Sequence, residues 1–173
     1  MLSKYFLSFR TASFLKSKLI IRSANGFSDA LRIGVLYTYS NKHNTGLVKQ
    51  IIEKLKNEGK KVETVTFIEK MEEADINKFP FFNLNDKDFW GNWTKPIVNN
   101  FIEIPFDYLL NLDLNTNIAT QNILARSKAK CRVGPFEEGK SDYFEMMIDH
   151  KENDYEKYLD QVYYYIKKVR NGK

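Results

Sequence analysis

Five basic residues lie within the first 28 positions of the chain, and no acidic residue accompanies them. They are Lys4, Arg10, Lys16, Lys18 and Arg22. The whole chain carries 27 basic and 22 acidic residues, so the excess positive charge lies entirely within this segment. Clustered cations create a local field that attracts polyanions, and aromatic residues between them can stack on nucleic-acid bases. The pattern predicts that these five side chains contact phosphate groups.

A second group of basic residues alternates along a short segment further on. If the chain is extended there, alternation places Lys128, Lys130 and Arg132 on one face and smaller or apolar residues on the other. This basic ridge could contact phosphates. Acidic residues close in the sequence, among them Asp142 and Glu145, could instead pair with the same charges. We favour charge pairing, because surface charges are usually solvated or paired.

A third candidate is the loop that precedes a predicted helix. It contains Lys42, His43 and Thr45, and a helix N-terminus beside them could hold an anion. The loop lacks the glycine-rich patterns of nucleotide-binding proteins. Thr45 is also a common type of capping residue, so helix capping and solvation are the favoured interpretation.

The other reactive side chains form no pattern typical of catalysis. Cys131 is the one cysteine of the chain, which excludes an intramolecular disulfide and favours a reducing compartment. It lies between charged residues in the alternating segment, so we expect it to point into the core. Asp113 and the other isolated carboxylates have no metal-binding or acid–base spacing. Trp90 and Trp93 flank Gly91 and could stack on a base or sugar, although such residues more often fill a core edge. We therefore predict no catalytic, cofactor or metal-binding residue, and no enzyme.

The pattern of apolar residues indicates alternating strands and helices. Short apolar runs predict buried strands at residues 32–39, 62–68, 106–112, 130–133 and 143–148. Helical spacing predicts helices from Thr45 to a stop at Gly59, from Pro96, over residues 115–125 and from Asp154 onward. The segment 69–92 has no clean periodicity and predicts an extended piece near Phe81. The expected fold is α/β, a Rossmann-like three-layer sandwich with a mainly parallel sheet of about five strands and a long C-terminal helix.

The basic segment is predicted to form an arm separate from this domain. Residues 1–28 would make a basic amphipathic arm, and residues 29–173 a single α/β domain. On a helical wheel Leu2, Tyr5, Phe6 and Phe9 fall on one side of the arm. This stripe either packs onto the domain or contacts a partner, and the sequence leaves both alternatives open.

Targeting patterns favour a cytoplasmic protein. No run of 18 apolar residues occurs, so we expect no membrane-spanning helix. A peripheral position on a membrane is an alternative, because the arm combines basic and aromatic residues. The arm is also basic, acid-free and serine-containing, which are features of a mitochondrial presequence, so the mitochondrial matrix is a minority alternative.

Several segments, taken in order, resemble known families. They are Lys87-Asp88-Phe89-Trp90-Gly91, Phe106-Asp107-Tyr108-Leu109-Leu110, Ser127-Lys128-Ala129-Lys130-Cys131-Arg132-Val133-Gly134 and Tyr143-Phe144-Glu145-Met146-Met147-Ile148. Together they are similar to an uncharacterised family of small bacterial α/β proteins, a domain of unknown function. The resemblance covers most of the chain from Arg32 onward and implies no activity. The middle segments also resemble the N-terminal half of heptosyltransferase-like glycosyltransferases, which build the donor site largely from a second half that has no counterpart here.

Three functional hypotheses follow. The favoured one is a non-enzymatic protein whose arm binds RNA, on a ribosome or a similar ribonucleoprotein particle. The second is a protein anchored to an anionic membrane surface by the same arm, with Phe6, Phe9, Phe14 and Leu15 inserted. The third is a small-ligand-binding or glycosyltransferase-like domain that uses the loop from Asn41 to Gly46. Membership of a larger protein assembly is compatible with the first.

Overall fold

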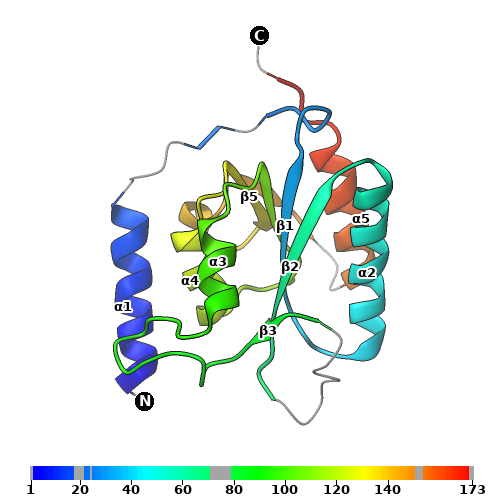
Figure 1. Ribbon diagram of the computed structural model, residues 1–173. Coiled ribbons are helices and arrows are strands. Elements are labelled where there is room, and N and C mark those ends of the chain that lie inside the picture. The colour runs from blue at the N-terminus through cyan, green and yellow to red at the C-terminus, as the bar shows by residue number, and fades with distance from the viewer. Residues whose placement is uncertain (1, 18–21, 24, 71–78, 151–153, 172–173) are drawn as a thin grey trace.

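A six-stranded parallel sheet lies between two layers of helices in the computed structural model (Figure 1). The structure describes residues 2–17, 22–23, 25–70, 79–150 and 154–171. The strands are β1 (Arg32–Thr38), β2 (Lys61–Phe67), β3 (Phe81–Phe82), β4 (Tyr108–Asn111), β5 (Cys131–Pro135) and β6 (Met146–Ile148). The helices are α1 (Leu2–Lys16), α2 (Lys42–Asn57), α3 (Pro96–Glu103), α4 (Ile118–Arg126), the 3₁₀ turn η2 (Ser141–Tyr143) and α5 (Tyr155–Ile166).

The sheet order is β3-β2-β1-β4-β5-β6, and every pair of neighbouring strands is parallel. The chain builds outward from β1 to β3 and then returns to place β4 on the other side of β1. In such sheets ligands usually bind where this reversal occurs, beyond the carboxyl ends of the strands. We call that side of the sheet the carboxyl edge and the opposite side the amino edge. The predicted α/β fold with a mainly parallel sheet is confirmed.

Two hydrophobic clusters hold the layers together. Helices α2 and α5 cover one face of the sheet, and α1, α3 and α4 lie on the other (Figure 1). Helix α2 buries apolar residues that repeat at helical spacing along it, including Leu47, Val48 and Ile51. It ends before Gly59, whose φ of 78° is a conformation that glycine adopts without strain. Helix α5 begins after Asp154, whose side chain accepts a hydrogen bond from the Lys157 N–H.

Some predicted boundaries change. The extended piece near Phe81 forms β3, which pairs with β2 and brings the strand number to six. The predicted strand at 143–148 shortens to β6, because residues 141–143 form the 3₁₀ turn instead. Helix α2 begins at Lys42 rather than Thr45, since Asn41 supplies the N-cap.

Helix α1 packs against α4 and contributes to the core. Leu7 is fully buried, and Thr11 is 3% exposed. The Thr11 hydroxyl donates a hydrogen bond to the Leu7 carbonyl (2.7 Å) and accepts one from Asn122 Nδ2 (2.9 Å). Asn122 Oδ1 in turn accepts one from Trp93 Nε1 (2.9 Å). Helix α1 therefore contributes Leu7 to the hydrophobic core. The division into an arm (1–28) and a domain (29–173) stays a prediction.

Candidate functional site

The outer face of α1 exposes aromatic rings. Tyr5 is 82% exposed and Phe9 is 73% exposed, and one helical turn separates them. The buried side of α1 is instead marked by Leu7 and Thr11. Of the two alternatives that the sequence left open for this stripe, packing onto the domain does not describe Tyr5 and Phe9. The hydrogen bond from Asn122 of α4 to Thr11 lies on this buried side.

A loop rich in aromatic residues lies beside α1. The Phe6 ring contacts the rings of Phe89 and Trp90, with centroids 5.4 Å and 5.7 Å away. Phe89 and Trp90 are 56% and 60% exposed. The loop approaches α1 closely at Gly91, which has a φ of 79° and where an added Cβ would lie 3.2 Å from the Leu7 backbone. Glycine at this position lets the loop pack closely against the helix.

We call Tyr5, Phe9, Phe89 and Trp90 the aromatic face. Its rings are exposed although each is large and apolar, and groups of exposed apolar side chains often mark interaction sites. The other tryptophan of the segment, Trp93, is 3% exposed and fills the core edge, in agreement with the expectation for loop aromatics.

The five basic residues of the arm occupy different environments. The side chains of Lys4 and Lys18 lie outside the described residues, although Lys4 belongs to α1. Lys16 is exposed in the last turn of the helix. Arg10 is half-buried, with its guanidinium 5.7 Å from the centroid of the Phe14 ring. Of the described side chains of this group, Lys16 is the one most open to solvent.

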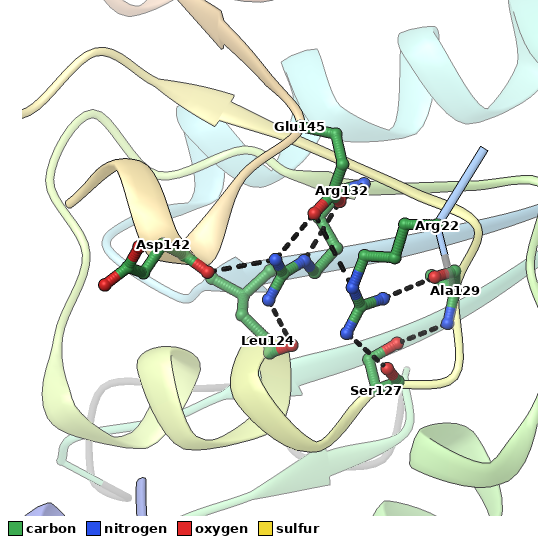
Figure 2. A network of polar contacts seen from close by, with 7 residues as sticks. All are labelled: Arg22, Leu124, Ser127, Ala129, Arg132, Asp142 and Glu145. Atoms are coloured by element: carbon green, nitrogen blue, oxygen red, sulfur yellow. Dashed lines mark hydrogen bonds and ion pairs between the residues drawn. The ribbon is translucent and has the colours of Figure 1, made fainter. Parts of the chain in front are cut away.

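Arg22 is directed into the molecule rather than outward (Figure 2). Its side chain is 12% exposed and lies 3.5 Å from a carboxylate oxygen of Glu145. Its guanidinium also donates hydrogen bonds to the carbonyl oxygens of Ser127 (3.0 Å) and Ala129. Burial lowers the pKa of Arg22 to about 10, and the positive charge of Arg132 contributes to this shift. Arg22 thus ties the segment after α1 to the start of β5, and contact with phosphate at this position stays a prediction.

Arg132 occupies the centre of the same network (Figure 2). Its side chain is 6% exposed and forms two hydrogen bonds with the Glu145 carboxylate, at 2.7 Å and 3.0 Å. It also donates to the carbonyl oxygens of Leu124 (3.1 Å) and Asp142 (2.9 Å). Every charge-bearing group of this arginine is therefore satisfied within the protein. We call Arg22, Arg132 and Glu145 the arginine–glutamate cluster.

The predicted basic ridge does not form an open surface of free cations. Arg132 is buried, Lys130 pairs with Asp107 (2.8 Å), and Lys128 pairs with Glu103 (2.5 Å). Asp107 also accepts hydrogen bonds from the backbone of Leu31 and Arg32. Burial alone would raise the pKa of Asp107, but these bonds and Lys130 lower it. Charge pairing, the favoured interpretation, describes all three residues.

The loop before α2 is organised by hydrogen bonds of its own. Asn41 Oδ1 accepts from the Asn44 N–H (2.8 Å), so Asn41, not Thr45, is the N-cap. The Thr45 side chain is buried and its hydroxyl donates to the Asn41 carbonyl (2.9 Å). Lys42 and His43 are exposed. The expectation of capping is correct for this loop, but the predicted capping residue was wrong.

A polar cluster that the sequence did not reveal closes the carboxyl edge between β1 and β4. Asp113, which is 8% exposed, accepts hydrogen bonds from the Thr38 N–H (2.6 Å) and the Thr38 hydroxyl (2.9 Å). Asn117 Nδ2 donates to the same hydroxyl (2.9 Å). Burial raises the pKa of Asp113 to about 7, against the lowering effect of the Thr38 bonds. We call Thr38, Asp113 and Asn117 the carboxyl-edge cluster.

The sequence does contain one indication of this cluster, which is the position of Asp113 just after a buried strand. Spacing between acidic residues, the criterion for catalytic or metal sites, does not detect it. That strand neighbours β1, where side chains meet at the reversal of the sheet. The partners Thr38 and Asp113 are 75 residues apart, so spacing along the chain cannot show their contact. Hydrogen bonds within the cluster and from the first turn of α4 satisfy its side-chain polar atoms, and the cluster lies where an α/β sheet usually holds a ligand.

The remaining candidates are structural. Cys131 is 2% exposed and burial raises its pKa to about 12, so it behaves as a small core residue, as expected. Among the described residues, no group of three or more histidine, cysteine or acidic side chains could hold a metal ion. None of the helices described is long and apolar enough to cross a bilayer.

Comparison with known proteins finds one family. A family model described as a family of unknown function (DUF6913) matches residues 4–169. Neither the curated proteins nor the solved structures include a match to the chain. The resemblance to an uncharacterised α/β family is thus confirmed over nearly the whole chain, α1 included, whereas the likeness to heptosyltransferase-like enzymes is not shown.

Proposed function

Because the chain belongs to DUF6913, a family of unknown function, we propose a role from its own surface: the protein is a non-enzymatic RNA-binding protein. The outer face of α1 and the adjoining aromatic loop hold a single-stranded segment of RNA, on a ribosome or a similar particle. The body supplies the platform that positions them.

The observation that carries this proposal is the aromatic face. Tyr5, Phe9, Phe89 and Trp90 are each more than half exposed and come from α1 and the loop that packs against it. Proteins that bind single strands stack bases on exposed aromatic rings, and each stacked base contributes about 1–3 kcal/mol. Stacking of this kind accepts any base, so it needs no groove that reads base edges.

The acid-free sequence of α1 supplies the charge for the backbone of the strand. Lys4, Arg10 and Lys16 belong to this helix, and Lys16 is exposed. Asp88 in the adjoining loop opposes them in part, and hydrogen bonds from Asn92 lower the pKa of its carboxyl group. The electrostatic contribution is therefore modest, and we expect stacking to supply the larger share of the affinity.

The same contacts disfavour insertion into a membrane. Of the four residues that an inserted arm would use, Phe6 packs against the aromatic loop, and Phe14 lies beside two guanidinium groups. Leu15 is half-buried, which leaves Phe9 as the exposed one. An interfacial helix needs a continuous apolar face. Helix α1 already packs against α4, and its exposed rings are better suited to stacking on bases than to insertion into a membrane.

The test is binding of the full-length chain to a fluorescent single-stranded RNA of about 16 nucleotides, the upper range for one binding domain. Phe9→Ala and Trp90→Ala each remove one exposed ring and should weaken binding by about 5- to 150-fold. Tyr164→Ala is the matched control, since Tyr164 is 56% exposed on α5, across the sheet from α1. Fluorescence anisotropy at several salt concentrations measures each dissociation constant.

Three outcomes would overturn the proposal. The first is no RNA binding by the full chain, and the second is equal RNA binding by Phe9→Ala and the Tyr164→Ala control. Salt-resistant binding to anionic vesicles without binding to RNA would instead support the membrane hypothesis. Deletion of residues 1–28 is a poor test, because it also removes Leu7, which is fully buried in the core.

A further inference from the structure

A pocket of about 780 Å³ lies beneath the C-terminal end of α1, on the side of the helix away from the aromatic face. Phe14 and Leu15 line it from α1, and Ile102 and Ala125 line it from α3 and α4. Its volume falls within the range of sites for small organic ligands. The pocket combines this apolar wall with four cationic side chains, Arg22, Arg126, Lys128 and Arg132, and with three acidic ones, Glu103, Asp142 and Glu145.

Arg126 forms no ion pair with any residue in the described part of the chain; burial lowers its pKa, and the charge of Glu103 offsets part of this effect. Its Nη1 atom is buried and makes no hydrogen bond to any described residue. Its guanidinium lies 5.4 Å from the centroid of the Phe14 ring, and Arg10 lies over the same ring. A buried donor without a partner costs free energy unless another group satisfies it. Arg126 is therefore available to an anionic ligand.

Lys128 can join Arg126, because its present ion pair is weak. Lys128 and Glu103 are 52% and 60% exposed, and exposed pairs contribute little to stability. The other two cations differ, since Arg22 and Arg132 are held by Glu145 and by backbone carbonyls. They form the fixed wall of the pocket, whereas Lys128 can exchange Glu103 for a ligand.

The C-terminal end of α4 would normally repel an anion, because its last carbonyl groups are negative. Arg132 binds the Leu124 carbonyl and Arg22 binds that of Ser127, the C-cap residue. These two guanidinium groups offset the negative end of the helix. An anion placed beside Arg126 thus meets carbonyl groups at this helix end that already accept hydrogen bonds, and the nearby Glu145 is paired with Arg22 and Arg132.

We propose that this pocket binds a small phosphate monoester, whose phosphate group contacts Arg126 and Lys128 and whose organic part packs against Ile102 and Leu15. A phosphate accepts several hydrogen bonds at once and is suited to a guanidinium and an ammonium together. The site is separate from the aromatic face and does not depend on RNA binding.

Calorimetric titration of the full-length chain tests the site with three probes: adenosine 5′-monophosphate, inorganic phosphate and adenosine. We expect the monophosphate to bind, phosphate to bind more weakly and adenosine not to bind. Arg126→Gln should weaken binding of the monophosphate at least about tenfold. Arg32→Gln is the matched control, because Arg32 forms an exposed pair with Glu63 away from the pocket.

Glu103→Gln separates ligand binding from any folding defect of the arginine variant. It removes the carboxylate that competes for Lys128, so the monophosphate should bind several-fold more tightly. A gain of affinity cannot arise from a damaged fold. Absence of binding to the unsubstituted protein, equal affinity in Arg126→Gln, or no gain in Glu103→Gln would each overturn the proposal.

Discussion

The amino edge and the carboxyl edge of the sheet each bury an ionisable side chain, but the groups that contact it differ in charge. At the amino edge Arg132 is 6% exposed and lies against the carboxylate of Glu145. At the carboxyl edge Asp113 is 8% exposed and receives hydrogen bonds from the neutral groups of Thr38. A nearby opposite charge stabilises the ionised form of a buried group. Neutral hydrogen-bond donors offset only part of the free-energy cost of removing an ionised group from water.

This difference predicts opposite behaviour. The arginine–glutamate cluster should contribute a nearly constant amount to stability at neutral pH and depend strongly on the presence of both charges. The carboxyl-edge cluster should make stability depend on pH, because burial raises the pKa of Asp113 to about 7. The amino edge therefore joins distant segments through ion pairs, whereas the carboxyl edge holds a carboxyl group with a pKa near neutrality.

The largest expected effect comes from Glu145→Gln. The substitution keeps the shape of the side chain but leaves the buried Arg132 and the largely buried Arg22 without a negative partner. Loss of one partner from a buried pair typically costs about 3–5 kcal/mol. Glu145 is 27% exposed, so we expect about 3 kcal/mol. Urea unfolding at pH 7 measures the loss.

The control for this variant is Glu103→Gln, which breaks the exposed pair with Lys128. Exposed pairs contribute about 0–1 kcal/mol, so this substitution should barely change the unfolding midpoint. If the two variants lost equal stability, the arginine–glutamate cluster would be no stronger than a surface pair.

The second effect is a pH dependence that Asp113→Asn removes. An unfolded aspartate titrates near pH 3.9, and the folded pKa is about 7, so the folded state holds the proton more tightly. The stabilising contribution is complete below about pH 4 and is lost as the pH rises through about 7. Between pH 5 and 8 the unsubstituted protein should lose about 2.5 kcal/mol relative to Asp113→Asn.

Urea unfolding of both proteins at pH 5, 6, 7 and 8 measures this difference. Glu137, Tyr155 and Tyr158 also act on this region, but they are present in both proteins. The difference between the two stability curves therefore reports Asp113 alone. Parallel curves would show that Asp113 is ionised throughout and that the two edges do not differ in this way.

Much of the fold follows from short-range patterns in the sequence. The strand β1 was predictable because a strand buried on both faces has a continuous run of apolar residues. The helix α2 was predictable because a helix buried on one face has apolar residues at helical spacing. The C-terminal helix begins after Asp154 for the same kind of local reason, a side chain that caps it. Strand ends were less predictable, because a turn such as η2 replaces a strand when tertiary contacts favour it.

The candidate sites follow from contacts that local patterns do not contain. Apolar residues occur around much of α1, so a helical wheel cannot decide that Leu7 faces α4 while Tyr5 and Phe9 face solvent. Arg22 looked like a free cation of the arm because its partner Glu145 lies in a distant segment. Asp113 looked isolated for the same reason, since Thr38 is 75 residues away.

The smallest expected effect comes from Thr38→Val, which tests how neutral donors act on a buried carboxyl group. The substitution removes the hydroxyl that donates to Asp113 (2.9 Å) and accepts from Asn117 (2.9 Å), but it keeps the backbone N–H bond to Asp113. One such bond to a charged group contributes about 1.5 kcal/mol, so we expect a loss of about 1 kcal/mol at pH 8. The loss should be smaller at pH 5, where Asp113 is protonated.

The same substitution should raise the pKa of Asp113 further, because the Thr38 hydroxyl stabilises the charged form. An NMR titration of the Asp113 carboxyl carbon in the folded protein measures this pKa directly. A pKa that stayed the same after the substitution would mean that the backbone N–H of Thr38 alone stabilises the carboxylate. The hydroxyl would then serve Asn117 and the start of α4, and the pH dependence at the carboxyl edge would arise from burial and one hydrogen bond.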